Sequence, residues 1–100
     1  MSVAGKVPVH SDWTPLGEVT ARSLERTGGR ISYVEVSPRD APARLTVRLV
    51  DSTGALDLVF LGRRVVAGLE PGAIVSVEGR VAANEDVPRI FNPRYELCLT

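Results

Sequence analysis

Apolar and polar side chains alternate along two neighbouring stretches in the middle of the chain. One stretch extends from Leu45 to Leu49 and the other from Leu56 to Phe60. A period of two places successive side chains on opposite faces of a strand, so each stretch predicts a β-strand with one buried face. Between them, Asp51-Ser52-Thr53-Gly54 predicts a tight turn, because Asp can bond its own backbone two residues on and Gly tolerates a positive φ. The pattern therefore predicts a hairpin.

The segment before this hairpin is also predicted to be extended. It runs from about Arg22 to Pro38 and is interrupted by Gly28-Gly29. Glycine inside a strand usually marks a bulge or a sharp bend, so the two halves of this strand are expected to pair with different neighbours. Further upstream, Thr14 as N-cap and Pro15 at the first helical position predict a brief helical turn.

Two more strands are predicted after the hairpin. One extends from Ala73 to Ala83 and is expected to bury its alternating valines, Val75, Val77 and Val81. The other extends from Val87 to Leu99. It contains Pro88 and Pro93, and proline suits an edge or a bulge better than a central strand.

Residues 62–69 connect the hairpin to these last strands. They are bounded by glycines and too short for a full helix, so we expect one or two helical turns that cap the sheet, with Val65 and Leu69 facing inward. The chain is thus predicted to consist of a lead-in, residues 1–21, and an all-β domain of five strands, residues 22–100. Only 5% of the residues are aromatic, and a core filled mainly by valine and leucine favours sheet over helix.

Three pieces of sequence carry a resemblance to a known family. They are Asp51-x-x-Gly54 before an LVF strand, Pro71-Gly72 before a VEG strand, and Asn92-Pro93-x-Tyr95-Glu96 near the end. In this order they resemble the wedge domain of RecG-type branched-DNA helicases and small stand-alone proteins of the oligonucleotide/oligosaccharide-binding fold, the OB-fold. The resemblance extends from about Gly29 to Leu97.

The resemblance implies a five-stranded Greek-key OB-fold barrel with a short helical segment between strands 3 and 4. It also implies a non-enzymatic module that binds single-stranded or branched nucleic acid weakly, with DNA favoured over RNA, alone or within an assembly. The chain has no GxxxxGK[ST] motif to hold a nucleotide phosphate, so it is not expected to act as a helicase by itself.

The binding face of such a domain is expected on the exposed side of the second and third strands. Alternation places no aromatic residue there, and Asp57 is expected to pair with Arg48 across the strands. The same alternation predicts an exposed pair, Val59 and Leu61. Stacking would then depend on aromatic residues from elsewhere. The candidates are Tyr33 and Phe91, although core packing is an alternative for Phe91.

A third aromatic residue, Tyr95, is expected to be structural, with its ring closing the barrel and its hydroxyl bonded near the rim. Twelve basic and twelve acidic side chains cancel, so a nucleic-acid site must be a local patch. Eleven of the basic residues are Arg, which suits forked phosphate contacts, although dispersed solvated charge is the alternative. The nucleic-acid-binding residues predicted on these grounds are Tyr33, Arg48, Arg63, Arg64, Arg80, Arg89, Phe91 and Arg94.

Other chemistry has little support in the sequence. Cys98 is the single cysteine and His10 the single histidine, so neither a disulfide nor a Cys-rich metal site is expected, and no catalytic group, metal or cofactor is predicted. The chain shows neither a signal-peptide pattern nor a long apolar run, which predicts a cytoplasmic protein without membrane contact. The competing hypothesis is a protein-interaction barrel with a protein partner or a second copy as ligand, because the net charge is zero.

Overall fold

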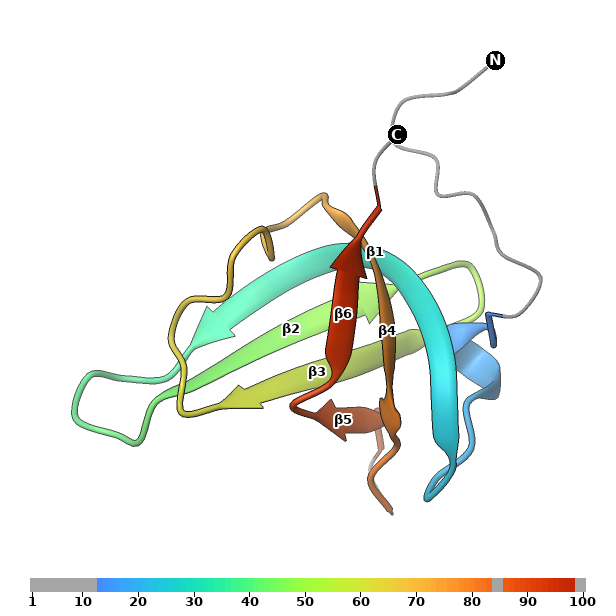
Figure 1. The fold of residues 1–100 in the computed structure, drawn as a ribbon, viewed down its shortest axis with the longest axis horizontal. Coiled ribbons are helices and arrows are strands. Elements are labelled where there is room, and N and C mark those ends of the chain that lie inside the picture. Colours follow the sequence, from blue (N-terminus) through green and yellow to red (C-terminus); the bar gives the residue numbers. More distant parts are fainter. Residues whose placement is uncertain (1–12, 84–85, 99–100) are drawn as a thin grey trace.

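The computed structural model describes residues 13–83 and 86–98 (Figure 1). Residues 1–12 of the predicted lead-in, with His10, lie outside the described residues. The described chain is built from strands and one short 3-10 helix, η1 (Leu16–Glu18), which confirms the all-β class. The strands are β1 (Leu24–Val36), β2 (Arg44–Val50), β3 (Ala55–Leu61), β4 (Ile74–Arg80), β5 (Arg89–Phe91) and β6 (Arg94–Leu97).

The strands form one mixed sheet in the order β5-β3-β2-β1-β4-β6. Every neighbouring pair is antiparallel except β3 and β5, which are parallel. The number of strands is six rather than the predicted five, because the expected last strand is divided at Asn92-Pro93 into β5 and β6. These two short strands stand at the two ends of the hydrogen-bonded order, so the ladder is that of an open sheet.

Strand β1 bends as predicted and serves two neighbours. Residues 24–30 pair with β4, whereas residues 30–36 pair with β2 (Figure 1). The glycines of the bend are required by close approach. A Cβ atom on Gly28 would lie 2.5 Å from the indole ring of Trp13, and one on Gly29 would lie 2.8 Å from the carbonyl oxygen of Val50.

A β-bulge follows the bend in β1. The register changes from Ile31 opposite Leu49 to Tyr33 opposite Arg48, so that Ser32 is an extra residue. Because side chains alternate between the faces of a strand, one extra residue moves every later side chain to the other face. Ile31 is therefore fully buried, while Tyr33, two positions later, is exposed on the outside of the sheet.

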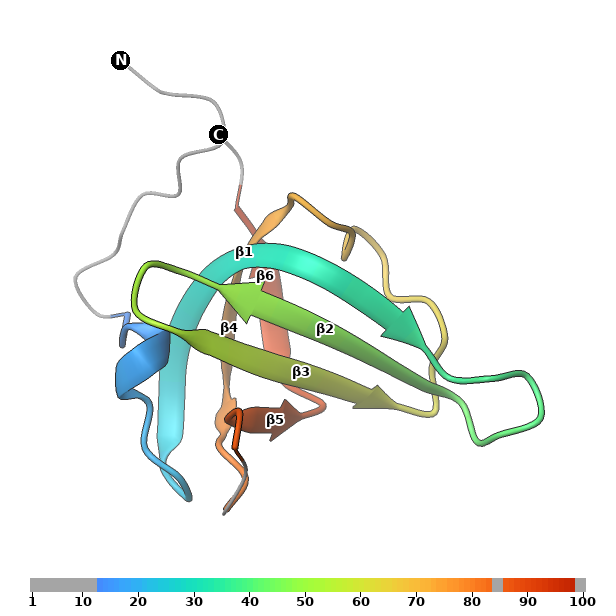
Figure 2. The same ribbon diagram turned by 180° about the vertical axis from the view of Figure 1, so that it is seen from behind.

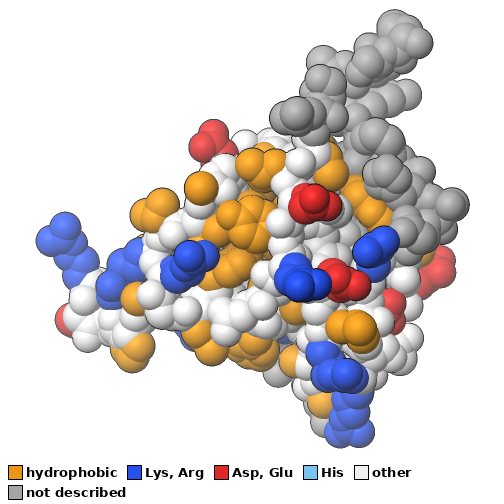
Figure 3. Space-filling model, in the orientation of Figure 1, with side chains coloured by type: hydrophobic (Ala, Val, Ile, Leu, Met, Phe, Trp, Pro, Cys, Tyr) orange, Lys and Arg blue, Asp and Glu red, His pale blue; other side chains and the backbone are white. Residues whose placement is uncertain are grey.

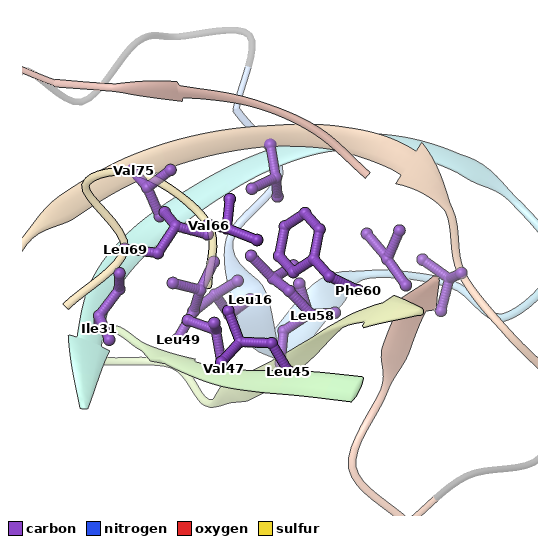
Figure 4. Packing of buried hydrophobic residues seen from close by; sticks show 14 residues of the cluster. Leu16, Ile31, Leu45, Val47, Leu49, Leu58, Phe60, Val66, Leu69 and Val75 are labelled. Atoms are coloured by element: carbon purple, nitrogen blue, oxygen red, sulfur yellow. The ribbon is translucent and has the colours of Figure 1, made fainter. Parts of the chain in front are cut away.

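The core lies on the concave side of the sheet, where side chains from β1, β2, β3 and β4 converge (Figure 4). The alternation predicted for the hairpin is confirmed on this side, and the three valines predicted to be buried near β4 are at most 2% exposed. Hairpin residues of this core are Leu45, Val47, Leu49, Leu56, Leu58 and Phe60, and the valines are Val75, Val77 and Val81.

The turn between β2 and β3 is joined by hydrogen bonds to the short helix η1. As predicted, the carboxylate of Asp51 accepts hydrogen bonds from the backbone of Thr53 (2.7 Å) and Gly54 (3.0 Å). It also accepts the backbone N–H of Leu16 at 3.0 Å. The N-cap prediction for Thr14 is wrong, because Pro15 occupies that position without a side-chain bond and Asp51 satisfies the helix N–H from a distant turn.

The reason given for Gly54 was also wrong. The glycines with positive φ are Gly62, Gly68 and Gly72, and Gly54 is not among them. A Cβ atom on Gly54 would instead lie 3.0 Å from the Cα atom of Gly17, so this glycine permits the close approach of η1 to the hairpin turn.

The helical segment predicted between strands 3 and 4 is not present. Residues 62–73 form turns, and φ values of +81° at Gly62 and +79° at Gly68 end any helical path there. Without a helix, the spacing of four residues does not bring Val65 and Leu69 to one face. Leu69 is buried as predicted, but Val65 is 82% exposed and its neighbour Val66 takes the inward position at 5%.

Within residues 13–83 and 86–98, no helix has the length and apolar character that crossing a membrane requires.

Candidate nucleic-acid interface

One row of side chains crosses the convex face of the sheet, on the side opposite the core. Tyr33 of β1 pairs in register with Arg48 of β2, Arg48 with Asp57 of β3, and Asp57 with Arg89 of β5. Strands β1, β2, β3 and β5 lie side by side in this order (Figure 2). Because directly opposed residues share a face, the row brings together four residues that are far apart in the sequence. We call Tyr33, Arg48, Asp57 and Arg89 the polar row.

The centre of the polar row is a forked ion pair. The Nε atom of Arg48 donates to Oδ1 of Asp57 at 2.6 Å, and Nη2 donates to Oδ2 at 2.9 Å. This confirms the predicted pairing. The side chains of Arg48 and Asp57 are 27% and 8% exposed, so the carboxylate is almost fully covered while the guanidinium reaches solvent. The hydrogen bond to Asp57 raises the pKa of Arg48 above its ordinary value, and the group stays charged.

The tyrosine end of the polar row contacts the same guanidinium. The Cζ atom of Arg48 lies 5.2 Å from the centroid of the Tyr33 ring, within the range of a cation–π interaction. Tyr33 nevertheless keeps 41% of its surface exposed. The ring is thus held by the arginine and remains open to a ligand.

A second row lies next to the first on the same face. It runs from Glu35 through Thr46 and Val59 to Phe91, which is 45% exposed. The expectation that β2 and β3 carry no aromatic residue on this face is confirmed, and Tyr33 and Phe91 reach the same face from β1 and β5. The alternative of core packing for Phe91 is wrong. Its neighbour in the chain, Ile90, is the buried residue.

The apolar pair predicted on β3 is exposed only in part. Val59 lies between Thr46 and Phe91 in the register and is 3% exposed. Leu61 at the end of β3 is 51% exposed, and the side chain of Asn92 accepts its backbone N–H at 2.9 Å. We call the exposed residues Tyr33, Leu61 and Phe91, together with the polar row, the convex-face site.

The other predicted arginines lie away from this site or have structural contacts. The Nη2 atom of Arg64 donates to the carbonyl oxygens of Pro38 (2.9 Å) and Ala41 (2.6 Å) and so holds the loop between β1 and β2. Arg80 donates to the carbonyl oxygen of Arg22 at 2.8 Å. Both side chains therefore have a structural role, because they bind the backbone of other segments of the chain.

Arg63 and Arg94 are exposed without sharing a strand with the polar row. Arg63 lies in the turns after β3, and Arg94 of β6 lies 3.9 Å from the carboxylate of Glu78. On the face that carries β4 and β6, basic side chains are spread out with acidic ones between several of them (Figure 3). Of the predicted arginines, Arg48 and Arg89 are those that the structure brings together with the aromatic residues.

Tyr95 has the structural role that its position predicts. Its ring meets Phe60 edge-on at a centroid distance of 5.9 Å and an angle of 81°. Its hydroxyl donates to the carbonyl oxygen of Ala67 at 3.1 Å. This side chain ties β6 to the connection between β3 and β4, so it is unavailable for stacking on a ligand.

Sequence reasoning did not find the two hollows that adjoin Trp13. One, of about 700 Å³, lies over β4 and β6 and is lined by Arg26, Glu78, Arg94 and Glu96 as well as Trp13. The other, of about 530 Å³, lies between Trp13, the bend of β1 and the β2–β3 turn. The first carries equal numbers of these basic and acidic side chains, which indicates no preferred ligand charge.

In the part of the chain that the structure describes, no three His, Cys, Asp or Glu side chains lie close enough together to hold a metal ion. Cys98 is half-buried, and this burial raises the pKa of its thiol, which keeps it protonated and unreactive at neutral pH.

Comparison of the sequence with models of known protein families gave no match, and comparison with curated protein sequences gave none either.

Proposed function

We propose that this chain is a non-enzymatic module of OB type that holds a single strand of nucleic acid, free or at a branch, on the convex-face site. The observation that carries the proposal is the exposure of two aromatic rings, Tyr33 and Phe91, on one face with a charged guanidinium between them. Proteins that bind single strands combine aromatic platforms with positive charge in this way.

The connectivity of the sheet supports the OB assignment. A bent first strand is shared between β2 and β4, and β3 is parallel to β5. An isolated bridge between Val81, just after β4, and Ile90 of β5 brings the two ends of the sheet towards each other. We interpret β5 and β6 as the two halves of one OB strand, separated at Asn92-Pro93.

The two exposed aromatic rings are far enough apart to stack on different bases. Tyr33 and Phe91 are three strand spacings of about 4.8 Å apart across the sheet and two residues, or about 7 Å, apart along the strands, which separates them by roughly 16 Å. Each ring can therefore stack on a different base of the same strand, and a base stacked on an aromatic side chain contributes about 1–3 kcal/mol.

Phosphate contacts are expected to contribute less than stacking. The net charge is zero, Arg48 is paired with Asp57, and Glu35 adds a negative charge to the same face. Each phosphate contacted on a single strand changes the slope of log affinity against log salt by about −0.7. We therefore expect weak binding with a shallow salt dependence.

The test is fluorescence anisotropy with labelled single-stranded, forked and duplex DNA and single-stranded RNA at about 50 and 200 mM salt. Single-stranded or forked DNA should bind more tightly than duplex. Tyr33→Ala and Phe91→Ala should each weaken binding about 5- to 100-fold, the equivalent of one stacked base. Leu24→Ala is the control, because Leu24 is a 63% exposed side chain outside this site. Equal affinities for all three variants, or no binding at 50 mM salt, would refute the proposal.

A protein partner is the second candidate function for the same face. Leu61 and Phe91, which are 51% and 45% exposed, place apolar surface on the site of a protein with no net charge. If a second copy is the partner, sedimentation velocity will show a concentration-dependent dimer that Phe91→Ala abolishes and Leu24→Ala does not.

A further inference from the structure

We infer that Arg48 selects guanine in the strand bound at the convex-face site. This inference rests on the proposed function and adds base specificity to it. The ligand is a guanine base next to the Tyr33 ring, recognised through its N7 and O6 acceptors.

Three contacts hold the guanidinium before any ligand arrives. Asp57 binds its Nε and Nη2 atoms at 2.6 and 2.9 Å, and the ring of Tyr33 lies 5.2 Å from its Cζ atom. Arginine side chains ordinarily lose much rotamer freedom when they bind a ligand, and a planar fork that is already fixed loses less. Arg48 is therefore a pre-organised donor.

One edge of the guanidinium remains open. The hydrogen bonds to Asp57 use Nε and Nη2, and among the described residues Nη1 has no acceptor. The side chain is 27% exposed, so this edge is accessible from the convex face. The edge formed by Nη1 and the second hydrogen of Nη2 presents two parallel N–H donors.

Guanine offers the matching pair of acceptors. Its N7 and O6 atoms lie side by side on one edge, whereas adenine pairs an acceptor with a donor there, cytosine presents a donor and thymine a single carbonyl oxygen with a methyl group. Phosphate also accepts a fork, but Asp57 neutralises the charge of Arg48, so directional hydrogen bonds count for more here than attraction between opposite charges. A base that stacks beside Tyr33 also brings its edge, rather than its phosphate, to the arginine.

Asp57 is a positioning residue in this account. Its carboxylate is 8% exposed and turned towards Arg48, so it acts on a ligand through the orientation of the guanidinium. Loss of the carboxylate is expected to reduce the preference for guanine more than the affinity for a strand without guanine.

The first experiment needs no variant. Anisotropy titrations compare a short oligothymidine strand, the same strand with isolated guanines, and that strand with 7-deazaguanine, which lacks the N7 acceptor but keeps the phosphates. We expect guanine to bind about 5- to 100-fold more tightly than thymine, the usual discrimination of a forked contact. The 7-deazaguanine strand should bind about two- to tenfold more weakly than the guanine strand, because it lacks one hydrogen bond.

Variants then assign the effect to Arg48. The double change R48Q/D57N removes the preference without leaving a carboxylate buried and unpaired, and D57N alone lowers the ratio of the guanine and thymine affinities. The matched control is R44Q, because Arg44 is an exposed arginine on the same face of the same strand. It should weaken both strands equally and keep their ratio.

The outcomes separate this inference from the proposed function. If oligothymidine binds but the guanine strand binds no more tightly than the 7-deazaguanine strand, the inferred recognition of guanine is wrong and the proposed function stands. A preference that persists in R48Q/D57N assigns it to another residue and also overturns the inference. If no strand binds to the unmodified protein, the proposed function fails and this inference with it.

Discussion

Removal of the Asp51 carboxylate is the sharpest test of how this fold is held together. Three backbone N–H groups, those of Leu16, Thr53 and Gly54, and the hydroxyl of Thr53 all donate to this side chain. In Asp51→Ala the turn loses its internal bonds, and η1 loses its attachment to the hairpin. The backbone groups at the turn are exposed and regain water, whereas the buried Leu16 must shift to do so.

The expected magnitude follows from these contacts. Loss of a side chain that satisfies the first N–H groups of a helix costs about 0.5–2 kcal/mol, and the solvated turn adds little more. We therefore expect Asp51→Ala to lower the free energy of unfolding by about 1–2 kcal/mol. For a domain of this size each kcal/mol corresponds to a decrease in Tm of about 4–8 °C.

The assay is thermal unfolding followed by circular dichroism, with Asp40→Ala as the matched control. Asp40 is an exposed aspartate in the loop between β1 and β2, so its loss should change stability by less than about 0.5 kcal/mol. Equal Tm values for the two variants would refute the stabilising role assigned to the hydrogen bonds of Asp51.

The dependence on pH provides a second readout of the same prediction. Burial by itself raises the pKa of Asp51, but its hydrogen bonds with Thr53, Leu16 and Gly54 together lower it below the ordinary value of 3.8. A carboxylate with a lowered pKa stabilises the fold fully above its unfolded value and loses this effect as the pH falls through its folded value. The stability difference between the unmodified protein and Asp51→Ala should therefore persist at neutral pH and decrease below about pH 4. A difference of the same size in strong acid would contradict the argument.

Three further predictions address the core and the connections around it. Val66→Ala should cost about 1–3 kcal/mol, because it leaves a cavity, whereas Val65→Ala should change stability by less than about 0.5 kcal/mol; urea unfolding of the pair would contradict the assignment if the order were reversed. Tyr95→Phe keeps the ring but removes the hydrogen bond to the carbonyl oxygen of Ala67, so we expect a loss of about 0.5–1.5 kcal/mol in the same assay, and no change would mean that water replaces the hydroxyl at no cost. Gly28→Ala should destabilise by about 1–3 kcal/mol, because the added methyl group meets the indole ring at 2.5 Å, and a rise in Tm would show that the ring can move away freely.

The local parts of the fold could be predicted from the sequence because their causes are local. Alternation in the hairpin predicted its buried face, and the Asp51 side chain predicted its turn, since both depend on residues that are neighbours in the chain. The double glycine predicted the bend of β1, and the position of Tyr95 predicted its structural role. The Arg48–Asp57 pair was predicted for the same reason, because a hairpin with a known turn has a known register.

The errors share a physical cause as well. One or two helical turns were predicted in the short, glycine-bounded segment after β3, but positive φ at two of its glycines makes the segment a series of turns, and the buried position is Val66 in place of Val65. Gly54 was assigned to positive φ, although it permits an approach of Gly17. Such contacts join residues far apart in the chain, so periodicity in one segment contains no information about them.

The candidate site shows this division most clearly. Local sequence patterns were enough to predict an all-β chain, a hairpin with one arginine and one aspartate facing each other, and the aromatic residues available for stacking. The face that these aromatic residues share depends on contacts between strands that are far apart in the chain. The extra residue in β1 turns Tyr33 away from the core and opposite Arg48, and parallel pairing of β5 with β3 adds Arg89 and Phe91 to the same face. Side-chain alternation is local, whereas register between distant strands is set by the packing of the whole sheet.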